Sequence, residues 1–232
     1  VPVGLVVIAD AEDRLPVALE VLQRAVDRLR RRGAVAEQGV GEVREHLLGG
    51  AGVDFDPQGA LSAGLGVRSN ELDETVYNLL VERGHDIHKV IQPSGVDNLD
   101  VLPANIDLSA AEVQLVGEVA REMILARVLR PVEDEYDVIL IDCQPSLGLL
   151  TVNALACSDG VLIPMECEYF SLRGLALLTD TIDKVRERLN PRLHLTGILI
   201  TMFDRRTVHA RDVLSRVVEV FGDKVFDTLV TR

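Results

Sequence analysis

The sequence lacks the features that would place it in a membrane or in an oxidising compartment. No apolar run reaches the ~18 residues of a membrane-spanning helix, and the N-terminus has no basic and then apolar segment of the kind that directs secretion. The three cysteines, Cys143, Cys157 and Cys167, have neither the spacing of a metal site nor that of a disulfide framework. We therefore expect buried free thiols in a reducing cytoplasm, and no membrane partner.

Lysine is scarce as well, and acidic residues outnumber basic ones. The formal net charge is −13 at pH 7, and the sequence pI is near 4.8. Lysine occurs only at Lys89, Lys184 and Lys224, so the whole N-terminal third of the chain contains none. A chain this acidic is a poor general ligand for nucleic acid, although it can still carry a local basic patch.

What the sequence does contain is a regular alternation of strands and helices. With 232 residues and 47% apolar content, the chain can bury a large core and is consistent with one α/β domain. Short apolar runs predict strands at 3–9, 99–104, 136–146, 160–166, 195–203 and 223–230. Helical periodicity and capping signals predict helices at 16–33, 70–84, 109–130, 171–189 and 207–221. This alternation predicts a mostly parallel sheet with helices on both faces.

Three carboxylates stand where such a sheet collects ligands. The apolar run VILID ends at Asp142, and the fragment VDFDPQG carries Asp54 and Asp56 directly before a turn. Ligands of parallel sheets gather beyond the carboxyl ends of the strands, and magnesium prefers oxygen ligands while keeping several waters. The pattern alone leaves two interpretations open: a site for magnesium and nucleotide, or acids that cap a loop and a helix entry.

Five spaced segments carry a resemblance to a known family. They are VDFDPQGALSAGLGV, VLPANIDLSAAEVQLVGEVARE, YDVILIDCQPSLGLLTVNAL, GVLIPMECEYFSLRGLALL and ILITMFDRRT, all within residues 53–232. Together they resemble the ParA/Soj family of chromosome- and plasmid-partitioning ATPases. The resemblance implies a P-loop NTPase-like fold, binding of ATP and Mg²⁺, a homodimer that sandwiches nucleotide, nonspecific DNA binding, and hydrolysis stimulated by a ParB-type protein. It also implies a cytoplasmic, nucleoid-associated protein.

The resemblance gives the three carboxylates different roles. Asp56 corresponds to the switch I acid that orients the attacking water, with Asp54 in support and Gln58 in the turn that follows. Asp142 corresponds to the Walker B acid near magnesium and its waters. The residues expected to serve catalysis and metal binding are therefore Asp56 and Asp142.

The resemblance also assigns positions further along the chain. Gln144, Pro145 and Ser146 occupy the switch II turn, and the stretch TMFD at 201–204 lies where the family's nucleotide-base pocket begins. The expected cofactor-binding residues are thus Asp54, Gln58, Gln144, Pro145, Met202 and Asp204. Arg205, Arg206 and Arg211 lie in a region that could touch DNA, and a solvated face is the alternative interpretation.

The segment that should receive the phosphates is absent from the sequence. In the family a KGGxGK[ST] loop follows the first strand, and its backbone amides and lysines bind the phosphate oxygens. Here the turn after the first predicted strand is DAEDRLP, with three acids, and QGVGEV at 38–43 has Glu42 where a lysine is needed. The fragment GGAG at 49–52 is also a poor ending for a buried strand. We therefore expect this chain neither to bind nor to hydrolyse ATP.

The chain is therefore predicted to have two parts, an atypical segment at 1–52 and a ParA-like ATPase domain at 53–232. Three explanations of the first part stay open: a frameshifted or wrongly joined reading frame, a divergent N-terminal unit on a nucleotide-free homologue, or an alternative phosphate site. Family members continue beyond the position of Arg232, so we also expect a truncated C-terminus. The leading hypothesis is a partitioning ATPase by descent that is inactive in this polypeptide. The alternative is a non-catalytic interaction module that binds a ParB-like partner or DNA without ATP.

Overall fold

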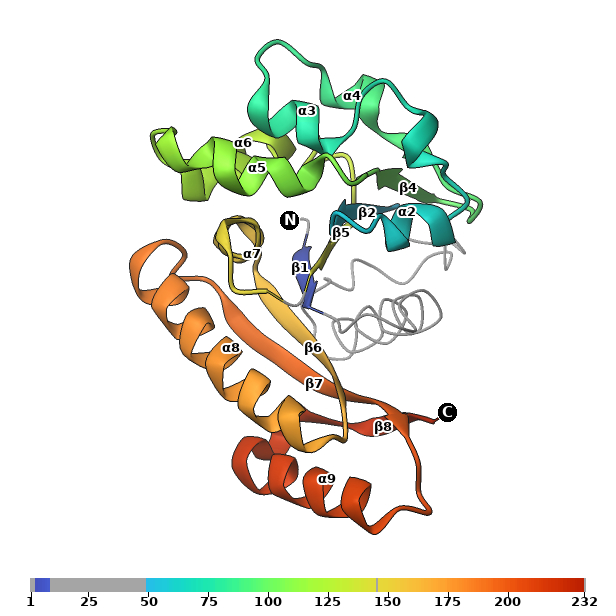
Figure 1. The fold of residues 1–232 in the computed structure, drawn as a ribbon, viewed down its shortest axis with the longest axis vertical. Helices are drawn as coiled ribbons and strands as arrows, with labels where there is room; N and C mark the ends of the chain where they lie inside the picture. Colours follow the sequence, from blue (N-terminus) through green and yellow to red (C-terminus); the bar gives the residue numbers. More distant parts are fainter. Residues whose placement is uncertain (1–2, 9–48, 145, 232) are drawn as a thin grey trace, which may run out of the picture.

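The core of the protein is one eight-stranded sheet. The computed structural model describes residues 3–8, 49–144 and 146–231. The strand order is β3-β4-β2-β5-β1-β6-β7-β8, and every neighbouring pair is parallel except β3 with β4 (Figure 1). The strands are β1 Val3–Ile8, β2 Gly50–Phe55, β3 Gln92–Pro93, β4 Leu99–Leu102, β5 Val138–Cys143, β6 Gly160–Glu166, β7 His194–Phe203 and β8 Val225–Thr231. The predicted mostly parallel sheet is confirmed.

Helices connect most of these strands. The α-helices are α2 Ala60–Gly64, α3 Val76–Val81, α4 Ile87–Val90, α5 Leu108–Gln114, α6 Ile124–Leu129, α7 Leu149–Cys157, α8 Tyr169–Arg188 and α9 Val208–Phe221. Short 3₁₀ turns are η1 Ser69–Glu71, η2 Leu115–Gly117, η3 Arg121–Met123 and η4 Gly222–Lys224. Within the described part of the chain, no helix is both long enough and apolar enough to cross a bilayer. The predicted helix at 16–33 lies outside the described residues.

The two faces of the sheet are covered by different elements. On one face, Val53 and Phe55 of β2 join the main core, which also contains buried side chains of α3 and α5 to α9. On the other face, a smaller cluster joins Leu61 and Leu65 of α2 to Leu99 and Val101 of β4. Alternate residues of a strand point to opposite faces, so Asp54 shares its face with α2. The prediction of helices on both faces is correct.

Most strands fall where apolar runs predicted them, and the run at 160–166 matches β6 residue for residue. The run predicted at 3–9 contains β1, Val3–Ile8, which is a central strand because it pairs with β5 on one side and β6 on the other. Strands in the middle of a parallel sheet typically have this kind of continuous apolar sequence. The sequence signal was strong at these positions for that reason.

The long helix predicted at 109–130 is wrong. Ser109 does not cap a helix; its Oγ donates to the carbonyl of Ile106 at 2.7 Å, inside the first turn of α5. The helical segments are interrupted near Glu118, which is extended, and Ala120, which has a φ of 52°. Arg121 Nη1 donates to the carbonyl of Val116 at 2.7 Å. In a continuous helix this carbonyl would accept a hydrogen bond from a backbone N–H, so the arginine replaces that donor.

The helix predicted from Asn70 also begins later than expected. Asn70 lies in η1, and α3 starts only at Val76. The N-terminal signal belongs instead to the pair Thr75 and Asn78, because the backbone N–H of Thr75 donates to Asn78 Oδ1 at 3.0 Å. A side-chain acceptor three residues into the helix thus marks its start.

The glycine-rich fragment before Val53 is part of a buried strand, contrary to the sequence-based expectation. All six residues of β2 are buried, including Gly50 and Gly52. A Cβ at Gly52 would lie 3.2 Å from Leu61 Cδ2, and one at Gly50 would lie 3.3 Å from Leu99 Cδ1. The glycines therefore let the leucines approach the sheet closely. The predicted boundary at Val53 falls within this strand, and the division of the chain there remains a prediction.

We predict that Gly52→Val destabilises the protein by about 1–3 kcal/mol, because a branched side chain must displace the α2 leucines. Gly49→Val is the matched control, since nothing lies within 4 Å of a Cβ built there. Urea denaturation followed by circular dichroism measures both free energies of unfolding. Equal effects of the two substitutions would show that close packing on Gly52 is unimportant.

Candidate functional site

The carboxyl ends of β2 and β5 bring two of the predicted acids side by side. Asp54 and Asp142 are register partners in these neighbouring parallel strands, and Val7 of β1 is the partner of Asp142 on the other side. Neighbouring strands lie ~4.8 Å apart, and register partners of a parallel pair point to the same face. Asp54, Asp56 and Asp142 are exposed by only 0%, 2% and 2%. The sequence-based prediction that these acids share one end of the sheet therefore agrees with the geometry.

Asp54 is held by one residue of α2. Ser62 donates to Asp54 Oδ2 twice, from its backbone N–H at 2.8 Å and from its hydroxyl at 2.6 Å. The same hydroxyl accepts from the backbone N–H of Ala104 at 3.2 Å, which links α2 to the end of β4. Burial raises the pKa of Asp54 to about 6, although the bonds from Ser62 oppose that shift. Asp54 therefore bonds to α2 of the protein itself, and its role is to position the residues of the site.

Asp56 organises the turn that follows β2. Its Oδ1 accepts from the backbone N–H of Gln58 at 2.8 Å, and its carbonyl accepts from Gly59 at 2.9 Å. Such a turn is typical of an aspartate at its first position. Gly59 has a φ of 64°, and a Cβ there would lie 2.9 Å from the carbonyl oxygen of Ala104. The turn therefore packs closely against the residues that follow β4. The side chain of Gln58 is exposed.

The loop after Asp142 leads directly into α7. Gln144 is half-buried, its carbonyl accepts from the backbone N–H of Ser146 at 2.8 Å, and Thr151 Oγ1 donates to the carbonyl of Ser146 at 2.6 Å. Pro145, the other predicted residue of this turn, lies outside the described residues. Cys143 points to the opposite face, where burial raises its pKa well above the usual value. A thiol in that state is a poor nucleophile.

Met202 and Asp204 lie at the same edge of the sheet but on a more distant strand. β7 is separated from β5 by β1 and β6, a distance of roughly 14 Å at ~4.8 Å per strand. Met202 has a φ of 51°, which is uncommon for a residue with a side chain. Asp204 Oδ1 accepts from both the backbone N–H of Arg206, at 2.9 Å, and its Nε, at 3.2 Å. The structure therefore does not bring these two residues into contact with the three acids.

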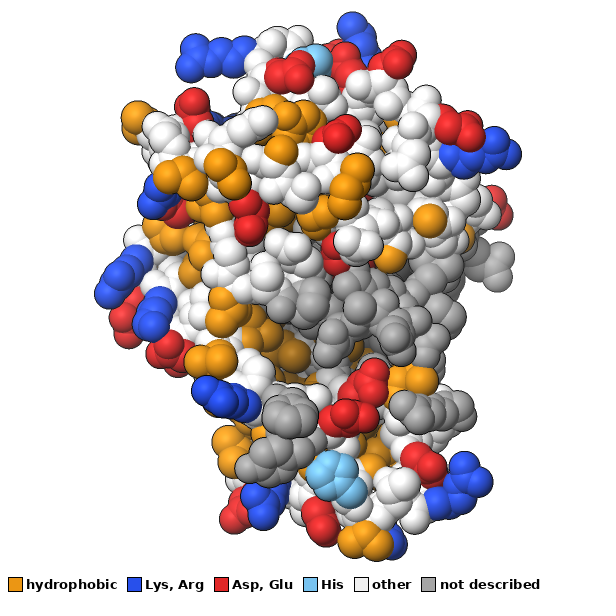
Figure 2. Space-filling model, in the orientation of Figure 1, with side chains coloured by type: hydrophobic (Ala, Val, Ile, Leu, Met, Phe, Trp, Pro, Cys, Tyr) orange, Lys and Arg blue, Asp and Glu red, His pale blue; other side chains and the backbone are white. Residues whose placement is uncertain are grey.

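The three arginines predicted to touch DNA are exposed around the β7–α9 turn. Arg206 is paired with Asp204, and its side chain is still 91% exposed. Arg205 precedes it in the turn, and Arg211 lies on α9. On the face drawn in Figure 2, basic side chains alternate with acidic ones and do not gather into one patch. DNA binding by these residues remains a prediction.

The donors at the carboxyl ends of β2 and β5 suit a hard cation better than a triphosphate. Asp56 and Asp142 offer carboxylate oxygens, which magnesium accepts while it keeps several waters. Among the residues that the structure describes, no group of three or more His, Cys, Asp or Glu is arranged to hold a metal ion. Of the three lysines, Lys184 is paired with Asp180 at 2.6 Å, while the others lie in α4 and η4. At this edge the described residues therefore offer two carboxylates of the kind that magnesium prefers and no lysine for the phosphates.

The sheet and its acids define a P-loop NTPase-like α/β protein, and known structures agree. A cobyrinic acid a,c-diamide synthase from Mycobacterium smegmatis matches with a TM-score of 0.80 and 32% identity, covering 100% of this chain and 86% of that one. The same protein with a bound ATP analog and magnesium also has a TM-score of 0.80, at 31% identity, covering 100% of this chain and 88% of that one. A plasmid partition protein from Borrelia burgdorferi, bound to AMPPNP, has the same fold with a TM-score of 0.70 and 22% identity, covering 100% and 87%.

Sequence comparison identifies the family more closely. A family model described as an AAA domain matches residues 51–195. The chromosome-partitioning ATPase Soj of Treponema pallidum is 50% identical over 180 residues, covering 78% of this chain and 70% of that one. The sporulation initiation inhibitor protein Soj of Bacillus subtilis is 46% identical, covering 78% and 71%. The chain belongs to the ParA/Soj family.

An uncharacterized protein of Mycobacterium tuberculosis strain H37Rv shows higher identity. It is 68% identical over 180 residues, which cover 78% of this chain and 57% of the relative. The matched region is thus little more than half the length of that relative. What the relatives do as whole proteins is therefore carried to this chain only as a proposal.

Sequence reasoning did not identify Ser62 or Gly59 as parts of this site. Ser62 is eight residues from Asp54, and only the fold of α2 back onto β2 brings them together. Gly59 ends the fragment VDFDPQG, and its positive φ and its close approach to Ala104 fix the turn. No short-range pattern marks either contact, because the first depends on how α2 packs on β2 and the second on the position of the residues after β4.

We predict that Ser62→Ala destabilises the protein by about 2–3 kcal/mol, because it removes one hydrogen bond to a buried carboxylate and one from Ala104. Ser69→Ala is the control: Ser69 is also buried, and no side-chain hydrogen bond is described for it. Thermal and urea denaturation at pH 7 would compare the three proteins. A Ser62 variant as stable as the Ser69 variant would contradict the role given to this bond.

Proposed function

We propose that this protein is a ParA/Soj-type partitioning ATPase by descent, and that the polypeptide of this sequence does not itself bind ATP. The proposal is supported by the family membership and by the three acids at the carboxyl ends of β2 and β5. In active members, ATP-dependent dimerisation, nonspecific DNA binding and a ParB-type partner would follow from nucleotide binding. We propose those activities for the active relatives from which this chain descends, and not for the polypeptide of this sequence. Its proposed location is the nucleoid region of the cytoplasm.

The single observation that carries the proposal is the place of β1 in the sheet. β1 lies between β5 and β6, and its carboxyl end therefore lies beside Asp142. A phosphate-binding loop would have to leave the sheet at this point. The sequence that follows β1 contains Asp10, Glu12 and Asp13, and no lysine occurs before Lys89. Acids at this position would repel a triphosphate, because like charges at short range repel each other.

A second candidate is a non-catalytic module that binds a ParB-type protein or DNA without nucleotide. It is favoured by apolar side chains that the fold leaves exposed near α5 and η2: Val113 is 77% exposed, Val116 57% and Val119 86%. Exposed apolar groups that cluster on a surface often mark an interaction site. Calorimetric titration of this chain with a ParB-type protein, without nucleotide, would distinguish the two candidates. Binding at micromolar concentration supports the module, and its absence removes the form of the module that binds a ParB-type protein.

We predict that the protein shows no saturable binding of a fluorescent ATP analogue with Mg²⁺ at micromolar concentrations. Each lost charge-assisted phosphate contact is worth about 1.5–3 kcal/mol, so the loss of two or more weakens binding on the order of a thousandfold. Fluorescence anisotropy measures this directly. Micromolar, magnesium-dependent binding would overturn the proposal.

A chimera supplies the matched control. Residues 9–48, between β1 and β2, would be replaced by the corresponding segment of Bacillus subtilis Soj. We expect this chimera to bind the analogue at micromolar concentration and to lose that binding with Asp142→Asn. A folded chimera that still fails to bind would show that the remaining domain has lost the family's site as well.

A further inference from the structure

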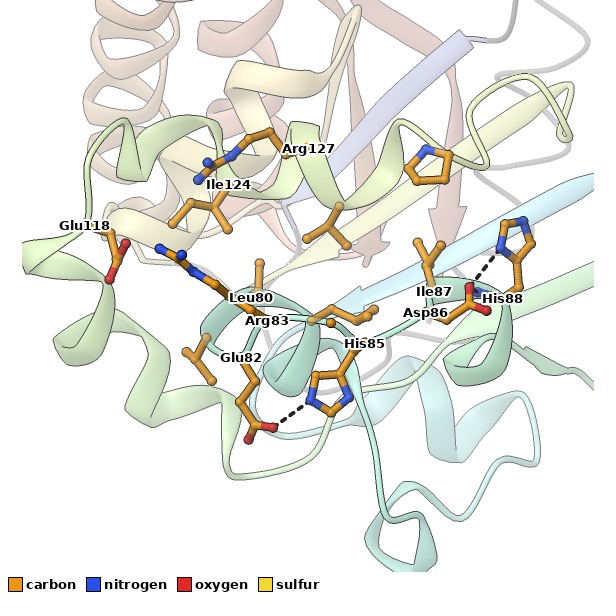
Figure 3. A pocket seen from close by; sticks show the side chains of 15 residues that line it. Leu80, Glu82, Arg83, His85, Asp86, Ile87, His88, Glu118, Ile124 and Arg127 are labelled. Atoms are coloured by element: carbon orange, nitrogen blue, oxygen red, sulfur yellow. Dashed lines mark hydrogen bonds and ion pairs between the residues drawn. The ribbon is translucent and has the colours of Figure 1, made fainter.

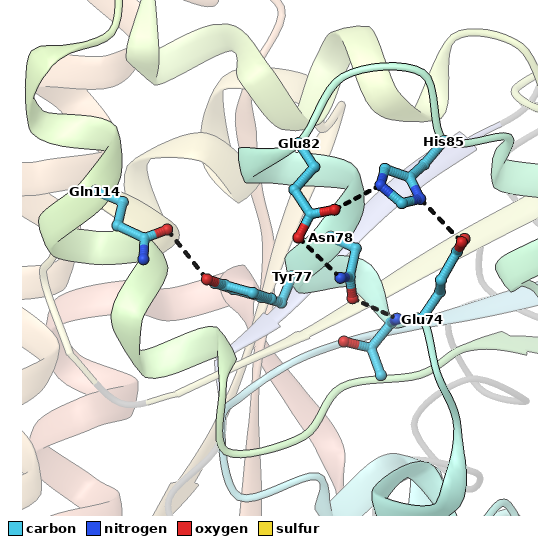
Figure 4. A network of polar contacts seen from close by, with 7 residues as sticks. Glu74, Tyr77, Asn78, Glu82, His85 and Gln114 are labelled. Atoms are coloured by element: carbon cyan, nitrogen blue, oxygen red, sulfur yellow. Dashed lines mark hydrogen bonds and ion pairs between the residues drawn. The ribbon is translucent and has the colours of Figure 1, made fainter.

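Two histidines near α3 and α4 each contact two carboxylates, one at each ring nitrogen. His85 Nδ1 lies 3.0 Å from Glu74 Oε1, and its Nε2 lies 2.7 Å from Glu82 Oε2 (Figure 4). His88 Nδ1 lies 3.1 Å from Asp86 Oδ1, and its Nε2 lies 2.9 Å from Glu135 Oε1. The same arrangement thus occurs twice within four residues of chain.

This geometry requires a charged ring. A neutral imidazole has one N–H donor and one acceptor nitrogen, whereas an ionised carboxylate can only accept. A ring placed between two carboxylates makes both bonds only when both nitrogens carry protons. Loss of one proton turns one of the two contacts into a repulsion between lone pairs. The two sites therefore depend on protonation through their geometry alone.

The contacts hold together a segment that we name the α3–α4 lobe, residues 74–91. Glu74 precedes α3 and Glu82 follows it, so His85 fastens the two ends of this helix to each other. Glu135 lies just before β5, 47 residues from His88 in sequence, so the second contact fastens the lobe to the entry of a central strand. Asn78 Nδ2 also donates to Glu82 Oε1 at 3.2 Å and steadies that carboxylate.

The lobe forms one wall of a cavity of about 500 Å³ (Figure 3). Leu80 and Ile87 line it from the lobe, and Ile124 lines it from α6. The other charged groups around the lobe are Arg83 beside His85, Lys89 beside His88, and Glu118 and Arg127 from across the cavity. The carboxylates bonded to the rings have the largest effects: Glu74 and then Glu82 raise the pKa of His85, and Glu135 and then Asp86 raise that of His88.

We propose that His85 and His88 are two pH-sensitive clasps, which close the α3–α4 lobe onto its cavity when protonated and release it when they lose a proton. The folded lobe binds these protons more tightly than the unfolded chain does. The stabilisation is therefore complete below the usual histidine value of 6.5 and is lost as pH rises through the raised values of the folded state. Release of the lobe also reaches the end of β4, because the Val76 N–H donates to the carbonyl of Pro103 at 2.9 Å.

The first test is an NMR titration of the wild-type protein, following the imidazole C–H signals from pH 5 to 9. We expect His85 and His88 to titrate above 6.5, because each ring lies between two carboxylates. His209, an exposed histidine on α9 outside this cluster, is the control site for the second test. Titration of either His85 or His88 at or below 6.5 would overturn the proposal for that clasp. This measurement needs no variant, so it does not depend on how substitutions fold.

The second test is amide hydrogen exchange at pH 6 and pH 8, corrected for the intrinsic exchange rate at each pH. In the wild type, protection of amides in 76–90 should fall about twofold to tenfold between the two values, a modest change because the pairs are solvent-exposed. The double variant His85→Gln with His88→Gln should show no such fall, while the control His209→Gln should behave as the wild type. A double variant with an unchanged pH response would contradict the clasp mechanism.

Discussion

The bond between Asp54 and Ser62 fixes much of the geometry around the site. A carboxylate with no exposed surface must receive strong donors, and one residue of a five-residue helix supplies two of them. Because the same serine hydroxyl also accepts from Ala104, three separate elements meet at one buried oxygen atom. The turn that carries Asp56 then has little freedom, since it must leave β2 and enter α2 within four residues. The hydrogen bonds of Ser62 thus help to set the position of Asp56.

Electrostatics distinguishes the two halves of the expected site. Asp56 and Asp142, which the family resemblance assigns to metal binding, are buried at the carboxyl ends of β2 and β5, whereas the phosphate half depends on a lysine-containing loop, and no lysine occurs before Lys89. Carboxylates at the carboxyl ends of strands are held in place by the sheet and by their buried environment. A phosphate loop instead depends on glycine, lysine and hydroxyl residues in one contiguous stretch. One altered stretch can therefore remove nucleotide binding while the fold and the acids remain.

The strands and the acids could be predicted from sequence because both leave short-range signals. The central strands β1 and β6 are continuous apolar runs, apart from Glu166 at the end of β6, and the acids lie at or just beyond the ends of β2 and β5. Helix limits near Asn70 and Ser109 were wrong, since polar residues with capping propensity also occur inside turns. The glycines of β2 were misjudged for a different reason. These glycines leave room for Leu61 and Leu99 to pack closely on β2, and both leucines come from other elements of the chain.

The central position of β1 has a consequence for how the chain reaches its fold. Val3 pairs with Val138, and Leu5 pairs with Gly160, so β1 must wait for partners that are synthesised much later. Contacts between residues so distant in sequence slow folding, because a large loop must close before they form. During that delay the apolar strand VGLVVI remains open to pairing with other chains. We therefore expect efficient folding in the cell to require that β1 is shielded from other chains until β5 and β6 have been synthesised.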